Sequence, residues 1–148
     1  MSGTCSAACA AAFHERLVCV CRPGTFPHII EELVHARYIN EVVVTLGGAD
    51  AYQFSQARRY LMQLPQQVRI VWNEGPRISR LFHMLVEHNL HIGPPGKGRA
   101  CWIAYGYVLA CQLSAIIALH DCDIVNYQHD LLARLVYPIA NPSIDFEF

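Results

Sequence analysis

Apolar positions along the chain follow two patterns, continuous runs and runs that recur at every third or fourth residue. The continuous runs predict buried strands at residues 17–21, 41–46, 68–72 and 116–123. The recurring positions predict amphipathic helices, which we place after Pro27 and around residues 54–62, 78–86 and 131–136, the last broken by Pro138. Residues 100–113 are apolar almost all round, which predicts a well-buried helix preceded by a loop at residues 93–98.

Strands and helices alternate in this pattern, which favours an α/β fold with a mostly parallel sheet and helices on both faces. Crossovers between parallel strands are right-handed, so the loops that follow the strands collect at one edge of the sheet. Ligands of open α/β sheets bind at that edge. Residues 22–24, Gly47-Gly48 and residues 121–123 are expected there. We expect one domain at residues 15–148 after a flexible tail at residues 1–14.

Composition excludes several classes of function. Hydrophobic residues make up 53% of the 148 residues and charged residues 16%, as in a folded domain. The net charge of −1 gives no electrostatic footprint for nucleic acid, and we expect no membrane span and no signal peptide. The seven cysteines are odd in number, which favours reduced thiols in a cytoplasmic protein. A redox protein that uses Cys19 and Cys21 is an alternative, and it requires a reactive thiol of low pKa.

The strand at residues 116–123 ends in two aspartates separated by one residue. Side chains alternate along a strand, so Asp121 and Asp123 are expected to share a face at the carboxyl end of the sheet. Two carboxylates in that position can hold a divalent cation between the protein and a ligand. The alternative is a polar turn in which Asn126 caps the next helix.

Two glycine-rich loops add candidates for phosphate binding. Gly47-Gly48 follows a strand, where backbone N–H groups can approach a phosphate, although a plain tight turn explains it as well. Gly96-Lys97-Gly98 precedes a helix, so Lys97 can face a diphosphate. Because Gly98 stands where a Walker A loop requires Ser or Thr, the segment is no Walker A motif. A solvated lysine in a Pro/Gly turn is the alternative.

The order of these segments resembles the nucleotide-sugar-binding half of a GT-A glycosyltransferase, with a Rossmann-like fold. It is most similar to the retaining branch that includes glucosyl-3-phosphoglycerate synthase and mannosylglycerate synthase. Residues 96–100 resemble that branch's G-K-G-x-A segment, and residues 131–142 resemble its family-specific stretch. The resemblance implies metal-dependent, retaining transfer of a hexose from a nucleoside-diphosphate sugar to a small acceptor such as 3-phosphoglycerate or glycerate.

The resemblance also implies roles for individual residues. Asp121 and Asp123 would bind Mg²⁺ or Mn²⁺, with Asp121 also near the ribose. The other donor-binding positions carried over from the family are Arg22, Pro23 and Gly24 beside the base, Gly47 and Gly48 beside the nucleoside, Lys97 and Gly98 beside the nucleotide or its phosphates, and Cys122.

The chain departs from the family in sequence and in length. Thr25-Phe26-Pro27 stands where the family carries an acidic residue, and Leu46 stands where an aspartate usually ends the second strand. Family members are much longer, so we expect a truncated chain that lacks the acceptor-binding half, with residues 144–148 opening a further strand. A non-catalytic nucleotide-binding or interaction module is the alternative function. The oligomeric state stays open, with a homodimer among the possibilities.

Overall fold

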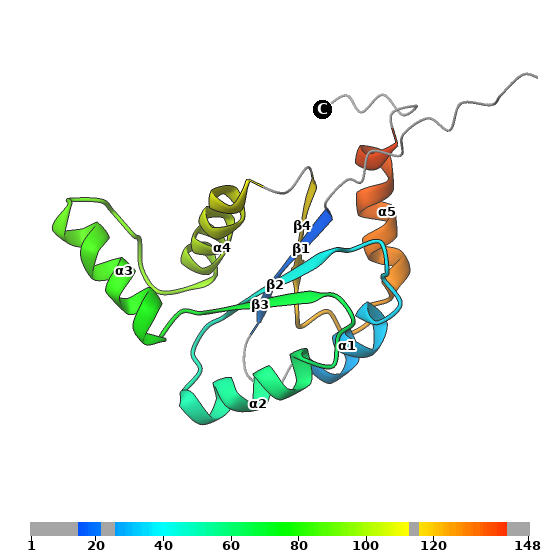
Figure 1. The fold of residues 1–148 in the computed structure, drawn as a ribbon, viewed down its shortest axis with the longest axis horizontal. Coiled ribbons are helices and arrows are strands. Elements are labelled where there is room, and N and C mark those ends of the chain that lie inside the picture. The colour runs from blue at the N-terminus through cyan, green and yellow to red at the C-terminus, as the bar shows by residue number, and fades with distance from the viewer. Residues whose placement is uncertain (1–14, 22–25, 113–115, 142–148) are drawn as a thin grey trace, which may run out of the picture.

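The computed structural model describes residues 15–21, 26–112 and 116–141. The predicted tail at residues 1–14 and the predicted strand at residues 144–148 lie outside these ranges. The described residues form four strands and five helices (Figure 1): β1 (Glu15–Cys21), α1 (Phe26–Leu33), β2 (Glu41–Leu46), α2 (Ala51–Leu61), β3 (Gln67–Trp72), α3 (Pro76–Glu87), α4 (Lys97–Cys111), β4 (Ile116–Asp121) and α5 (His129–Ala140).

The described strands form one parallel sheet in the order β3-β2-β1-β4. Helices α1, α2 and α5 cover one face of the sheet, and α3 and α4 lie at the other (Figure 1). The predicted α/β fold, with a parallel sheet and helices on both faces, is therefore confirmed. All carboxyl ends of the strands point to one edge, as parallel pairing requires.

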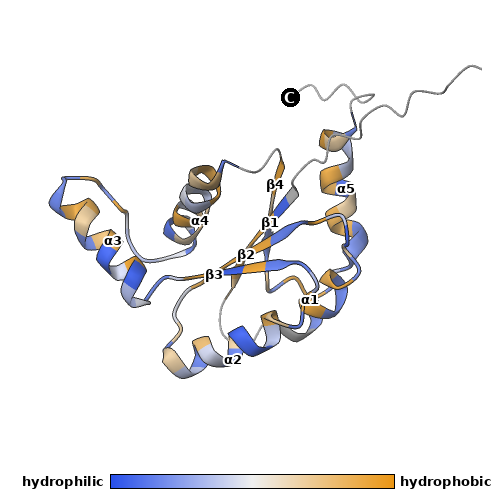
Figure 2. Cartoon of the chain, in the orientation of Figure 1, coloured by the Kyte–Doolittle hydropathy of each residue, from blue (hydrophilic) through white to orange (hydrophobic). Residues whose placement is uncertain are grey.

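Alternation along β1 supplies both apolar cores. Leu17 and Cys19 pack into the core beneath α1, α2 and α5, whereas Val18 joins Val43 in the core beneath α3 and α4. Figure 2 shows that the strands are mostly apolar, with polar residues in β1 and β3, and that most of the helices mix apolar and polar residues. Every residue of β2 is buried, which explains why this strand reads as a continuous apolar run. Burial of one such valine stabilises the fold by roughly 1.5–3 kcal/mol.

Helix α4 differs from the prediction in its start and in its burial. It begins at Lys97, so the predicted loop ends at Gly96. Ala104 and Val108 pack against the sheet, but Trp102 is 50% exposed and Leu109 is 68% exposed. The prediction of a helix buried all round is wrong because the described residues cover only the face of α4 that points to the sheet.

Helix α5 also differs from the prediction at both ends. Its N-cap residue is Gln128 and not Asn126. The carboxylate of Glu32 accepts the backbone N–H of His129 at 3.0 Å, which satisfies one free donor of the first turn. The helix continues through Pro138 to Ala140, so the predicted break is wrong. Proline removes one N–H, and the bond from Asn141 N–H to the Tyr137 carbonyl at 3.0 Å still closes the last turn.

The amino ends of the strands carry a buried ion pair that the apolar pattern did not predict. Arg16 Nε lies 2.6 Å from Glu41 Oε2, and the two side chains are 6% and 5% exposed. Arg69 Nε, on a half-exposed side chain, lies 3.2 Å from Glu41 Oε1. Arg16 also donates to the Val108 carbonyl at 3.4 Å. These contacts tie β1, β2, β3 and α4 together at the edge away from the strands' carboxyl ends.

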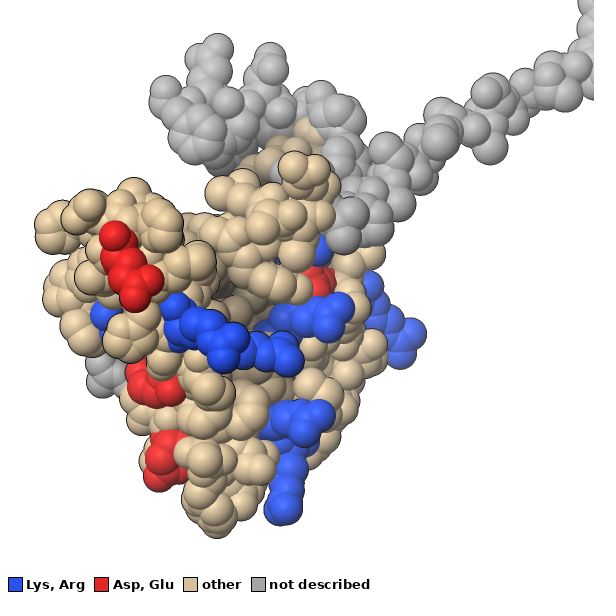
Figure 3. Space-filling model, turned by 60° about the vertical axis from the view of Figure 1, so that its left-hand side comes forward, with Lys and Arg blue, Asp and Glu red and all other residues tan. Residues whose placement is uncertain are grey.

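The surface carries charges of both signs. Figure 3 shows Lys and Arg side chains in a band across one face, with Asp and Glu side chains at its borders. None of the helices in the described ranges is long and apolar enough to cross a bilayer.

Candidate functional site

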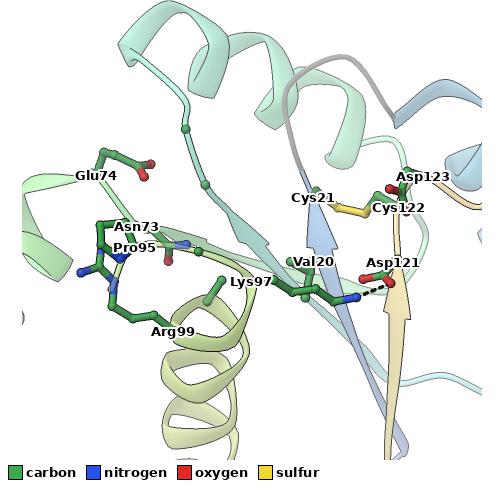
Figure 4. A pocket seen from close by; sticks show the side chains of 14 residues that line it. Val20, Cys21, Asn73, Glu74, Pro95, Lys97, Arg99, Asp121, Cys122 and Asp123 are labelled. Atoms are coloured by element: carbon green, nitrogen blue, oxygen red, sulfur yellow. Dashed lines mark hydrogen bonds and ion pairs between the residues drawn. A yellow bond between two sulfur atoms is a disulfide. The ribbon is translucent and has the colours of Figure 1, made fainter. Parts of the chain in front are cut away.

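A cavity of about 640 Å³ opens at the carboxyl ends of the strands. Figure 4 shows side chains from β1, β4, α4 and the end of β3 facing it. The residues that line it are Val20, Cys21, Gly47, Gly48, Asn73, Glu74, Pro95, Gly96, Lys97, Arg99, Ala100, Asp121, Cys122 and Asp123.

Strand pairing brings the lining segments together. Val20 pairs with Asp121 in the parallel register of β1 and β4, and the next backbone bond runs from Cys122 N–H to the Val20 carbonyl at 3.2 Å. On the other side of β1, Gly47 N–H donates to the Cys21 carbonyl at 3.2 Å. Sequence-distant loops therefore meet because their strands are neighbours in the sheet.

Lys97 and Asp121 form an ion pair across the cavity. Lys97 is the first residue of α4, and its Nζ lies 2.5 Å from Asp121 Oδ2 (Figure 4). The hydrogen bond to Asp121 raises the pKa of Lys97, so the ammonium stays charged at neutral pH. The side chains are 60% and 37% exposed, which leaves both accessible to a ligand. This arrangement differs from a lysine pointing into solvent from a turn.

The two aspartates line the same cavity, but for a different reason than predicted. Strand β4 ends at Asp121, and Asp123 lies in the turn that follows. Strand alternation therefore does not place Asp123; the turn does. Its carboxylate is exposed.

The cavity offers oxygen ligands for a divalent cation. Two carboxylates supply the oxygen atoms that Mg²⁺ and Mn²⁺ prefer, and such ions commonly take their other ligands from phosphate and water. Among the described residues, no group of three or more His, Cys, Asp and Glu side chains could hold a metal ion by itself. The residues present therefore fit a cation held jointly with a phosphate-bearing ligand, and do not form a cage made of protein alone.

Cys21 and Cys122 form a disulfide in the wall of the cavity, with their Cα atoms 5.1 Å apart. The expectation of reduced thiols is therefore wrong for these two residues. Cys19 is a buried free cysteine whose pKa is raised to about 12, mainly because burial disfavours the thiolate. A redox protein that uses Cys19 and Cys21 as a reactive pair is contradicted, since the pKa of Cys19 is raised and not lowered, and Cys21 bonds to Cys122.

Three polar side chains of the cavity were missed by sequence reasoning. Asn73 and Glu74 directly follow β3, and Arg99 lies in the first turn of α4. Asn73 Oδ1 accepts from the Thr45 hydroxyl at 3.3 Å, and Glu74 Oε2 accepts from Ala49 N–H at 3.5 Å. The signal that could have found the first two is their position directly after β3, because the segments after the other three strands were all considered as candidate sites.

Of the glycines predicted to bind the donor at positions 47, 48 and 98, only the first two line the cavity. Gly47 and Gly48 line it, and a Cβ on Gly47 would lie 3.3 Å from Asn73 Nδ2, so the backbone approaches its neighbour closely. Gly48 has φ of +68°, a conformation that favours glycine. Gly98 is not among the lining residues. The predicted base-side residues Arg22, Pro23 and Gly24 lie outside the described ranges.

His120, on β4, is not among the residues that line the cavity. It is 3% exposed, and its Nδ1 lies 3.1 Å from the hydroxyl of Tyr127, which is fully buried. Burial lowers the pKa of His120. The histidine is a buried packing residue behind the cavity.

No family model matches the chain. The chain is 42% identical over 122 residues to a glucosyl-3-phosphoglycerate synthase of Persephonella marina, and 35% identical over 121 residues to one of Methanococcoides burtonii. These matches cover 82% and 81% of this chain but 30% of each relative, so the chain spans about a third of their length. The predicted resemblance is confirmed.

Proposed function

We propose that this chain forms the nucleotide-sugar-binding part of a glycosyltransferase. The proposed reaction transfers a hexose from a nucleoside-diphosphate sugar to a small acceptor such as 3-phosphoglycerate or glycerate, with a divalent cation and with retention of anomeric configuration. The observation that carries the proposal is the meeting of Lys97, Asp121 and Asp123 in one cavity at the carboxyl ends of the strands. Both relatives are named glucosyl-3-phosphoglycerate synthase, which supports the sugar transfer but gives neither the metal nor the stereochemistry. A cytoplasmic location stays a prediction.

Different lining residues are proposed to bind different parts of the sugar nucleotide. Gly47 and Gly48 line the cavity without a Cβ, so the backbone there leaves room for a nucleoside. The ammonium of Lys97 supplies a positive charge at the first turn of α4, where the helix dipole adds to it. Charge-assisted bonds of this kind favour a diphosphate over an uncharged ligand. Arg22, Pro23 and Gly24 are proposed to border the base.

Asp121 and Asp123 are proposed to hold Mg²⁺ or Mn²⁺. Such an ion supplies charge neutralisation for the nucleoside diphosphate that leaves when the sugar–phosphate bond breaks. Lys97 reaches Asp121 at 2.5 Å through a side chain that is 60% exposed, so it is free to turn from the carboxylate to a phosphate. The site can therefore exchange one internal ion pair for contacts to an anionic ligand at little cost, because an exposed ion pair contributes little to stability.

A non-catalytic nucleotide-binding module is the second candidate. The same cavity would then bind the nucleotide without transfer of the sugar. Lys97 and the two aspartates in the cavity account for nucleotide binding, which is the part of the function that both candidates share. The two candidates differ in one measurable property, which is turnover with 3-phosphoglycerate or glycerate after donor binding.

Isothermal titration of UDP-glucose and GDP-glucose, each with and without Mn²⁺, tests the proposal. We expect binding that requires the metal and that weakens at least about tenfold in Asp123→Asn, since one charge-assisted contact contributes roughly 1.5–3 kcal/mol. Glu87→Gln is the matched control, because Glu87 is an exposed carboxylate outside the cavity.

The outcomes separate the candidates. Metal-dependent binding followed by release of nucleoside diphosphate in the presence of an acceptor supports the transferase. Binding without release supports the module. If Asp123→Asn and the unmodified protein bind the sugar nucleotide with equal affinity, or if binding does not depend on Mn²⁺, the aspartates do not form the proposed site.

A further inference from the structure

The Cys21–Cys122 disulfide has a position that sets it apart from an ordinary structural cross-link. Cys21 ends β1, and Cys122 lies between the two aspartates of the cavity. Both cysteines line the cavity although they are only 2% and 6% exposed. In Figure 4 the sulfur bridge crosses from β1 to β4 next to Asp123. The covalent bond therefore lies within the proposed donor site.

The disulfide ties the turn that carries Asp123 to the neighbouring strand. One backbone bond, from Cys122 N–H to the Val20 carbonyl at 3.2 Å, already joins the start of this turn to β1. The disulfide adds a second tie at the same residue, between positions 101 residues apart in sequence. Asp123 follows immediately and has an exposed side chain, so its position depends on how firmly Cys122 is held.

We propose that the Cys21–Cys122 pair is a redox-responsive tie that sets the affinity of the donor site. The proposal rests on the proposed function, because the affinity concerned is that for a nucleoside diphosphate with its cation. The disulfide form holds the Asp121–Asp123 segment in the arrangement described above and binds tightly. The dithiol form leaves the turn at Asp123 freer, so binding must first order it and is weaker.

The chemistry of the switch is thiol–disulfide exchange with a dithiol reductant. A thiolate of the reductant attacks one sulfur of the Cys21–Cys122 bond and releases the other cysteine as a thiolate, which takes up a proton. The second thiol of the reductant then displaces the protein cysteine from the mixed disulfide. Two electrons and two protons pass to the protein, which carries two thiols, and the reductant becomes a disulfide.

The nearby free cysteines do not compete in this exchange. Burial raises the pKa of Cys19 to about 12 and also raises the pKa of Cys101, so both are protonated at neutral pH. A thiol is a poor nucleophile compared with its thiolate. Cys21 and Cys122 are therefore expected to interconvert as one isolated pair.

The test compares the oxidised protein with protein reduced by dithiothreitol, from which the reductant has been removed without air. Titration with UDP and with GDP, each with Mn²⁺, should show at least about fivefold weaker binding by the reduced form, at the low end of the usual range for coupled sites. Linkage demands the reciprocal effect: the bound nucleotide should make the disulfide harder to reduce by the same factor. Alkylation followed by mass spectrometry counts the free thiols at Cys21 and Cys122.

A variant and a control complete the design. Cys21→Ser should bind like the reduced form and should not respond to dithiothreitol. Cys111→Ser, at a free cysteine outside the cavity, should bind like the oxidised protein and keep the response. If Cys21→Ser does not fold, the two redox forms of the unmodified chain still decide the question.

The result separates this inference from the proposed function. Equal affinities of the two redox forms, or tighter binding by the reduced form, overturn the redox tie and leave the donor site in place. The absence of nucleotide binding in both forms overturns the proposed function and the redox tie together. Weaker binding on reduction, matched by nucleotide protection of the disulfide, supports the tie.

Discussion

The two ends of the sheet each hold an ion pair, and the two pairs differ in how far they are exposed to water. At the amino ends, Arg16 and Glu41 lie 2.6 Å apart with side chains 6% and 5% exposed. At the carboxyl ends, Lys97 and Asp121 lie 2.5 Å apart with side chains 60% and 37% exposed. The distances are alike, so burial is what distinguishes the pairs.

Burial decides what each pair can do. Removing one partner of a buried pair leaves a charge without water or a counter-ion, so the pair is locked in place by the cost of breaking it. An exposed pair exchanges its contacts for water with little change in free energy. The Arg16–Glu41 ion pair at the amino ends of the strands is therefore fixed. The Lys97–Asp121 pair at the carboxyl ends can exchange its contacts, and this is the edge where ligands of α/β sheets bind.

The largest effect is expected from breaking the buried pair. Arg16→Met leaves Glu41 with Arg69 alone, whose side chain is 52% exposed. We expect a loss of about 3–5 kcal/mol in the free energy of unfolding, measured by urea denaturation. Arg80→Met, at an exposed arginine on α3, is the control and should change stability little. If Arg16→Met lowers the free energy of unfolding by less than about 1 kcal/mol, the Arg16–Glu41 pair contributes no more than an exposed surface pair. The contrast between the buried and the exposed ion pair would then fail.

A contact between Glu32 and His129 lies between these extremes in exposure, and we expect it to respond to pH. Glu32 Oε2 lies 3.0 Å from His129 Nδ1, with side chains 26% and 45% exposed, and joins α1 to the start of α5. The hydrogen bond from the His129 side chain is the main cause that lowers the pKa of Glu32. A lowered carboxylate pKa adds stability that is present above the ordinary pKa of glutamate and is lost as the pH falls through the folded-state pKa.

The pH response is measured by urea denaturation between about pH 6 and about pH 3, on either side of the ordinary glutamate pKa. The stability advantage of the unmodified protein over Glu32→Gln should shrink as the pH falls. Glu31→Gln, at an exposed neighbour on the same helix, should show no such convergence. Parallel curves for the unmodified protein and Glu32→Gln would mean that ionisation of Glu32 contributes nothing to folding.

The sequence predicted the features that depend on one strand at a time. Continuous apolar runs marked β1 and β2 because these strands are central and buried on both faces. Short motifs that follow strands, such as Gly47-Gly48 and the aspartate pair, could be placed at one edge by handedness alone. These residues do line the cavity together.

Features that depend on which elements are neighbours could not be predicted. The Cys21–Cys122 disulfide requires β4 to lie beside β1, and the sequence does not state the strand order. The exposed face of α4 is a similar case, because an apolar pattern tells which residues are suited to burial and not which of them are covered. Trp102 and Leu109 are apolar and exposed.

The smallest effect on stability is expected from breaking the exposed pair. Here we expect the nucleotide affinity to fall while the urea midpoint stays unchanged. Lys97→Met removes the ammonium that Asp121 contacts, yet the urea midpoint should stay within experimental error, because water replaces the contact. The affinity for UDP or GDP should still fall about tenfold, since a charge-assisted contact to phosphate contributes roughly 1.5 kcal/mol or more. Lys97→Arg keeps the charge and should retain most of the affinity. A urea midpoint that drops in Lys97→Met as it does in Arg16→Met would mean that the carboxyl-end pair also holds the fold together, and the two edges of the sheet would no longer differ in kind.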